Sequence, residues 1–120
     1  MHNFSREAMK RPYRTLEAVR VLREKAGVIE RATNNARADE VVVAVIGNNL
    51  SFGGVWTLAR EDLARQVSVV EDEGGWSLTF SPNTPAAQIA QRCDELARIA
   101  QKRGEAMQRW ARRHRHDIHE

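Results

Sequence analysis

The last twelve residues of the sequence, RWARRHRHDIHE, gather several side chains that could bind a metal ion or a polyanion. The metal-binding candidates are histidines and carboxylates, namely His114, His116, Asp117, His119 and Glu120. On a continuing helix, His114 and His116 would point to different sides. No cysteine or second cluster completes a coordination shell of the kind that Zn²⁺ requires. We therefore predict no metal site and no cofactor.

The same end of the chain is strongly basic. Between residues 98 and 116, Glu105 is the only acidic residue. Most of the 19 basic residues of the chain are arginines, whose planar guanidinium matches phosphate and carboxylate groups. The candidates for holding DNA, RNA or another polyanion are Lys102, Arg103, Arg109, Arg112, Arg113 and Arg115. Arg14, Arg20 and Arg23 are candidate additions to the same surface.

Catalytic groups are harder to assemble from this sequence. All four histidines lie near the two ends of the chain, and no histidine falls among the predicted strands. Cys93 stands on the apolar row of a predicted helix, where a cysteine usually serves as a small buried hydrophobe. The acidic run Glu71–Glu73 falls in a predicted turn that water would solvate. We predict no catalytic residue, and the sequence favours a protein that is not an enzyme.

Length and composition favour one cytoplasmic domain. The chain has 120 residues, 42% of them hydrophobic, which suits a single α+β domain spanning residues 1–120. A lone cysteine fits a reducing compartment, and the first residues lack the apolar core of a signal peptide. The longest apolar run, 41–46, is too short to span a membrane. Residues 1–12 and 114–120 are predicted to be flexible.

Apolar residues recur every three or four positions near the N-terminus, which predicts an amphipathic helix from Thr15 to about Thr33. Val41–Ile46 then changes the pattern, because β-branched residues favour a strand. Gly47-Asn48-Asn49 suits a hairpin turn into a second strand, and Gly53-Gly54 suggests a bulge there. Because 41–46 is apolar at every position, both faces of this strand need cover. An all-helical structure for 39–66 is the competing interpretation.

A second hairpin is predicted from alternating residues. Val67 and Val69 alternate with Ser68, the run from Glu71 to Gly75 turns the chain, and Trp76–Phe80 alternates again. A short helix from about Arg60 to Gln66 would join the two hairpins.

The sheet aromatics, namely Phe52, Trp56, Trp76 and Phe80, could stack nucleic-acid bases. In the alternating pattern of the strands, however, they lie on the same face as the leucines, so we expect them in the core.

A long helix from Pro85 to about Arg113 completes the predicted fold. Pro85 suits the first helical position, and an apolar row runs along one side, consisting of Ile89, Cys93, Leu96, Ala100, Met107 and Trp110. The predicted architecture is α+β: an amphipathic N-terminal helix, a four-stranded and mainly antiparallel sheet of two hairpins, and this long helix packed on the sheet. The helix is longer than the sheet needs for cover.

Three functions are compatible with this architecture. The first is a non-enzymatic module for protein–protein interaction or homodimerisation, through the long helix and the strand 41–46. Its predicted contact residues are Val41, Val43, Met107 and Trp110, and its partner would be a second copy or a larger protein. The alternative is binding of DNA or RNA phosphates by the basic helix. The third is a ligand-binding or enzymatic domain with a pocket between sheet and last helix, lined by residues such as Tyr13, Trp56 and Trp76. No membrane partner is expected.

Overall fold

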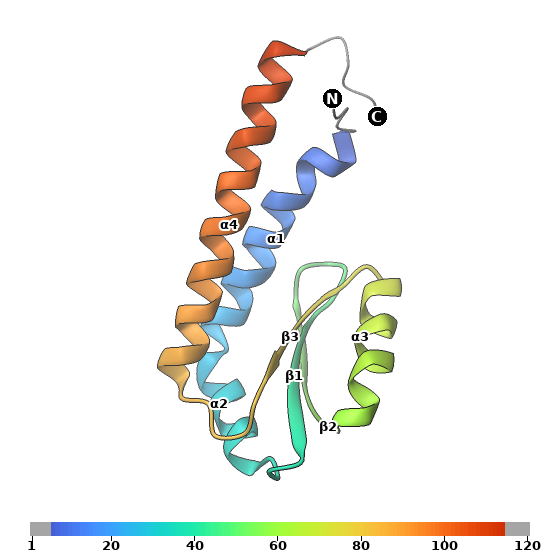
Figure 1. Ribbon diagram of the computed structural model, residues 1–120, viewed down its shortest axis with the longest axis vertical. Helices are drawn as coiled ribbons and strands as arrows, with labels where there is room; N and C mark the ends of the chain where they lie inside the picture. The colour runs from blue at the N-terminus through green and yellow to red at the C-terminus, as the bar shows by residue number, and fades with distance from the viewer. Residues whose placement is uncertain (1–5, 115–120) are drawn as a thin grey trace.

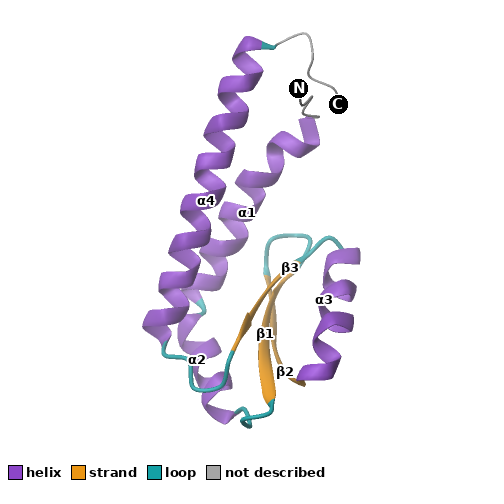
Figure 2. Cartoon of the chain, viewed as in Figure 1, coloured by secondary structure: helices purple, strands orange, loops and turns teal. Residues whose placement is uncertain are grey.

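The computed structural model describes residues 6–114, with side chains from residue 10 onward. Its class is α+β, as the sequence predicts (Figures 1 and 2). The elements in chain order are α1 (Arg6–Glu24), α2 (Ala26–Asn35), β1 (Glu40–Ile46), β2 (Phe52–Ala59), the 3-10 turn η1 (Arg60–Asp62), α3 (Leu63–Asp72), β3 (Trp76–Phe80) and α4 (Ala86–Arg113).

The sheet has three antiparallel strands in the order β2-β1-β3. β1 is central because it is the strand that can bury both faces, and every residue from Val41 to Ile46 is buried. Ala44 and Ile46 pack into the core formed with α1, α2 and α4. Val43 and Val45 pack on the opposite face against Val70 of α3. Figure 2 shows α3 alone on that side of the sheet.

The predicted four-stranded sheet is wrong at residues 67–70, which belong to α3 and not to a strand. Val67 and Val69 alternate like strand residues, but Leu63, Val67 and Val70 recur at helical spacing, and Val70 is the buried one. The second face of β1 needs apolar cover, and a helix provides it. The first hairpin is confirmed by the pairing of β1 with β2, which also rules out the all-helical alternative for 39–66.

The N-terminal helical region is longer than predicted and is divided in two. α1 already begins at Arg6 and contains Pro12, so residues 6–12 are helical in the structure. The helix predicted to run from Thr15 to Thr33 is interrupted at Lys25, whose backbone lies outside the helical region (φ −97°, ψ 13°). Residues 1–5 and 115–120 lie outside the described part of the chain.

A bulge in the first hairpin decides where the aromatic side chains point. The register shifts between Val45 and Ile46, so Ile46 is opposite Phe52 while Val43 is opposite Trp56. Because the shift inserts one residue into β2, the side chains on the two sides of the bulge point to opposite faces relative to a regular alternation. Phe52 therefore packs on the side of α1 and α4, whereas Trp56 shares the α3 side with Val43. The sequence predicted a bulge at Gly53-Gly54 but placed both aromatics on one face.

The direction of α4 is set by a buried hydrogen-bonded junction with α2. Thr33 is fully buried, and its hydroxyl accepts a hydrogen bond from the Thr84 backbone N–H at 3.1 Å. The Asn83 N–H donates to the Thr33 carbonyl oxygen at 2.9 Å. At the first turn of α4, the Ala86 N–H donates to the Glu30 carboxylate at 2.7 Å, which satisfies a helix-terminal donor. This junction starts α4 against α2 and directs it along α1.

The molecule is elongated because α1 and α4 run side by side beyond the sheet (Figure 1). Its principal extents are 53 × 28 × 24 Å and its radius of gyration is 16.4 Å. A compact chain of this length has a radius of gyration of about 14 Å. The part of α4 that exceeds the sheet therefore packs on α1, and the two helices form a projecting arm.

Candidate functional site

A glycine allows the two helices of the arm to approach closely. Gly104 is buried, and a Cβ atom at this position would lie 3.3 Å from Tyr13 Cζ and 3.5 Å from Pro12 Cβ. Contacts this short leave little room for a larger residue. The N-terminal turns of α1 and the C-terminal turns of α4 are thereby brought together, although they are about ninety residues apart in sequence. Their basic side chains consequently share one end of the molecule.

We call this end the basic arm and define it by residues 10–13 of α1 and 102–113 of α4. Seven exposed basic side chains lie on it: Lys10, Arg11, Lys102, Arg103, Arg109, Arg112 and Arg113. Glu105 is its only acidic residue. Within the described part of the chain, the ion pairs join other residues, so none neutralises these seven cations. The arm is therefore a concentrated positive surface.

Four basic residues form a row along α4 that begins at Arg98, one turn before the arm, and continues along the arm. Arg98, Lys102, Arg109 and Arg113 are all exposed, and their spacings of four, seven and four residues place them within about 60° around the helix axis. The buried residues Ala100, Gly104 and Met107 occupy the opposite side. The row extends over about 22 Å at the helical rise of 1.5 Å per residue. Such a row could contact several successive charges of an extended polyanion.

The other arginines considered in the sequence are engaged elsewhere. Arg14 lies at the base of the arm, where it donates to the Asn48 carbonyl oxygen at 2.9 Å. Arg20 pairs with Glu17 at 3.2 Å. Arg23 pairs with Asp94 of α4 at 2.8 Å, and this hydrogen-bonded contact raises the pKa of Arg23 further. The remaining candidate, Arg115, lies outside the described residues.

The residues predicted for a protein interface lie mostly inside the chain. Val43 is fully buried, and Val41 and Met107 are nearly so. Trp110 is half-buried, and its ring stacks on His114 with a centroid separation of 4.8 Å. The structure therefore does not bring these four residues together on one exposed surface. They stabilise the arrangement of the single chain.

Metal-binding groups do not gather in the described part of the chain, where no set of three or more histidine, cysteine, aspartate or glutamate side chains could hold an ion. His114 ends α4, and its Nδ1 lies 3.0 Å from the Trp110 carbonyl oxygen. The other tail candidates, His116, Asp117, His119 and Glu120, lie outside the described residues.

Cys93 lies in the core between the sheet and the helices and is fully buried. Burial raises the pKa of its thiol, because an apolar environment disfavours the thiolate. A thiol that is buried and protonated is a poor nucleophile. This placement agrees with a packing role.

Alkylation of Cys93 by iodoacetamide in the native protein is expected to be at least about 100-fold slower than in the denatured chain, because the thiolate forms only on opening. The measurement is a mass-spectrometric time course at mildly alkaline pH, with and without denaturant. Comparable rates in the two conditions would contradict the buried position of this thiol.

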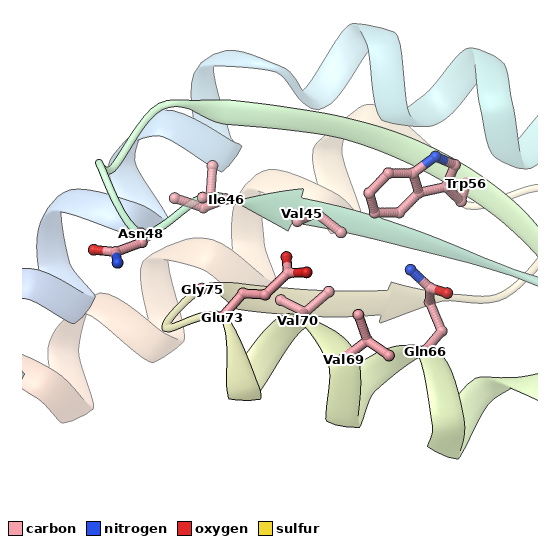
Figure 3. A pocket seen from close by; sticks show the side chains of 10 residues that line it. Val45, Ile46, Asn48, Trp56, Gln66, Val69, Val70, Glu73 and Gly75 are labelled. Carbon is pink, nitrogen blue, oxygen red and sulfur yellow. The ribbon is translucent and has the colours of Figure 1, made fainter.

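A groove lies on the other side of the molecule, between the sheet and α3 (Figure 3). Its volume is about 210 Å³, and it is lined by Val45, Ile46, Gly47, Asn48, Trp56, Gln66, Val69, Val70, Glu73 and Gly75. The Glu73 carboxylate points into it in Figure 3. The sequence pattern does not predict this groove, because it indicates a strand at 67–69 and a turn at Glu71–Glu73.

The pocket that the sequence predicted between sheet and last helix would have joined Tyr13, Trp56 and Trp76. The structure separates them, since Trp76 is opposite Ile46 on the helical face while Trp56 is opposite Val43 on the α3 face. Tyr13 packs at Gly104 in the arm.

No family model, curated protein or solved structure matches this chain. Of the described helices, none is both long and apolar enough to cross a lipid bilayer. The two surfaces with distinctive chemistry are the basic arm and the α3 groove, and they lie on different elements.

Proposed function

We propose that this protein is a binding module that holds nucleic acid by its phosphate backbone on the basic arm. One observation carries the proposal: seven exposed cations and a single acidic residue lie on an arm that projects from the sheet. A projecting surface can lie against an extended polymer without interference from the rest of the molecule. Arginine and lysine contacts of this kind supply affinity that does not depend on base sequence.

The helix surface itself supports a polyanionic partner. Arg98 and Lys102, and likewise Arg109 and Arg113, are four residues apart, and Arg109 and Arg112 are three apart. Like charges at these spacings destabilise an isolated helix by about 0.2–0.5 kcal/mol per pair. Phosphates between the side chains would convert this repulsion into attraction. A helix end that served solubility alone would gain from alternating charges instead.

The proposal predicts binding that weakens steeply with salt. If the four residues of the row each contact a phosphate, log K should fall with log salt concentration with a slope of about −3.6 on duplex DNA. Affinity should therefore drop about 150-fold between roughly 50 and 200 mM salt. The measurement is fluorescence anisotropy of a labelled duplex of mixed sequence, titrated with protein at several salt concentrations.

A duplex of the same sequence with an uncharged peptide backbone is the matched control, and it should not bind. The proposal is overturned if neither duplex nor single-stranded DNA or RNA binds at about 50 mM salt with the protein at tens of micromolar. Equal affinity for the charged and uncharged backbones would also overturn it.

Homodimerisation through the long helix and the strand 41–46 has less support. Val41, Val43 and Met107 are buried within one chain, so a partner would reach them only if the chain opened. This burial bears on these residues alone and not on self-association through other surfaces.

A further inference from the structure

The α3 groove combines exposed apolar side chains with a carboxylate. Trp56 and Val69 are among its lining residues and remain 41% and 44% exposed. Glu73 directs its carboxylate into the same space (Figure 3). Apolar walls accommodate the aliphatic stem of a long basic side chain, and a carboxylate at one end can pair with the charged head. This chemistry fits an arginine or lysine side chain.

Elsewhere in the sheet, the aromatic rings are already covered by cations of the same chain. The Arg14 guanidinium carbon lies 5.3 Å from the Trp76 ring centroid. Lys25 Nζ lies 5.4 Å from the centroid of Phe52. The Arg92 guanidinium carbon lies 5.2 Å from the centroid of Phe80. Trp56 is the sheet aromatic that, within the described part of the chain, has no such cation. Tryptophan gives the most favourable ring for this contact.

The end of α3 is acidic, and one of its acids, Glu73, lines the groove. Glu71, Asp72 and Glu73 follow one another at the end of α3 and are all exposed. None of the three forms an ion pair within the described residues, where the pairs involve other acids. Glu73 therefore places uncompensated negative charge in the groove, and the basic arm presents uncompensated positive charge.

We propose that the α3 groove receives basic side chains from the arm of a second copy of this chain. Charge complementarity supports this occupant: the arm holds seven exposed cations, the end of α3 holds three exposed acids of which Glu73 lines the groove, and Trp56 has no cation over its ring within the described residues. No residue of the arm lines the groove of its own chain. Because two different surfaces meet, the contact is heterologous and can continue from copy to copy.

The inference does not rest on nucleic-acid binding, although both use the arm. A phosphate backbone and the groove of a second copy would compete for the same cations, so assembly and nucleic-acid binding would be mutually exclusive at one arm. The test below contains no nucleic acid, and it can therefore fail while the proposed function holds.

Two defective variants test the contact by complementation. V69K/E73K places positive charge in the groove and leaves the arm intact, whereas K102E/R109E/R113E reverses the arm and leaves the groove intact. Each variant alone should be monomeric in sedimentation equilibrium at low salt. Mixed in equal amounts, they should form a complex of twice the mass of one chain, because one intact groove and one intact arm remain.

The matched control is E24K/V28K, which makes the same changes four residues apart at exposed positions near the junction of α1 and α2. It should associate like the unmodified protein, whose average mass should rise with concentration and fall again with added salt. Circular dichroism and thermal melting verify that each variant folds. If V69K/E73K is unfolded, the single substitution E73K at the exposed end of α3 replaces it in the mixture.

Three results would overturn the inference. The first is an unmodified protein that stays monomeric at low salt up to hundreds of micromolar. The second is self-association that persists in V69K/E73K, and the third is a mixture of folded variants that fail to combine. Duplex binding by a protein that remains monomeric would overturn the groove contact alone and leave the proposed function in place.

Discussion

The triple substitution K102E/R109E/R113E is expected to lower the affinity for duplex DNA at least about 100-fold at roughly 50 mM salt. All three side chains lie on the exposed row of α4, opposite its buried side. From the counterion-release slope, one phosphate contact contributes roughly 15-fold at this salt concentration relative to 1 M. The combined loss of affinity from three contacts therefore exceeds 100-fold, and the introduced carboxylates also repel the phosphate backbone.

The matched control is R31E/R37E/R60E, which changes the net charge by the same amount. These arginines are exposed, and their elements lie at the end of the molecule away from the arm (Figure 1). Their reversal should change the affinity by less than about fivefold, because screening limits the reach of exposed charges. If both triple variants lost affinity equally, net charge and not the arm would account for binding.

Replacing Gly75 by alanine is expected to destabilise the protein by roughly 3 kcal/mol, the upper end of the cost of overpacking. A Cβ atom at Gly75 would lie 2.6 Å from the Ile46 carbonyl oxygen and 3.1 Å from Val70 Cγ1. The first of these is a backbone atom of the central strand and cannot rotate away. The added methyl group would push the end of α3 from β1, where the groove has its floor.

Gly27→Ala provides the control with the opposite sign. Gly27 lies in α2, where the nearest atom to an added Cβ is Arg31 Nη1 at 3.9 Å. Alanine in a helix is favoured over glycine by about 0.5–1 kcal/mol, so this variant should be more stable than the unmodified protein. Urea unfolding followed by circular dichroism measures both. Equal stability of the two variants would contradict the close packing of Gly75 on β1.

The parts of the fold that the sequence predicts well are those with strong local signals. Pro85 and the apolar row from Ile89 to Trp110 specify α4 to within one residue at its start. The β-branched run from Val41 to Ile46 specifies β1, and its apolar character on both parities correctly requires cover on two faces. In these segments, local propensity and tertiary packing favour the same structure.

The short helix predicted over about 60–66 covers only the first turn of α3, and the rest of α3 is missed because its local signals conflict. Val67 and Val69 favour a strand by propensity and alternation, yet the spacing of Leu63, Val67 and Val70 suits a helix. The second face of β1 decides between them, because α3 is the helix that covers Val43 and Val45 there. The need to cover this face of β1 arises from the sheet, and it is not visible in the sequence of residues 63–72 alone.

The two candidate sites differ in how far the sequence predicts them. The exposed row of α4 follows from helical periodicity, and its role in binding stays a prediction. Lys10 and Arg11 join the arm only because α1 extends through Pro12 and packs at Gly104, which no local pattern indicates. The groove depends on the bulge that turns Trp56 to the α3 side. It also depends on the helix at 63–72, where alternating valines favour a strand, so both features are needed to form this surface.

The central claim is that the arm neutralises phosphates, and the salt dependence of duplex binding tests it most directly. The slope of log K against log salt concentration should be smaller by about 2.7 in K102E/R109E/R113E than in the unmodified protein, because each lost contact removes roughly 0.9. The slope of R31E/R37E/R60E should match that of the unmodified protein. Identical slopes for the unmodified protein and the arm variant would contradict the claim, since the three cations would then release no counterions.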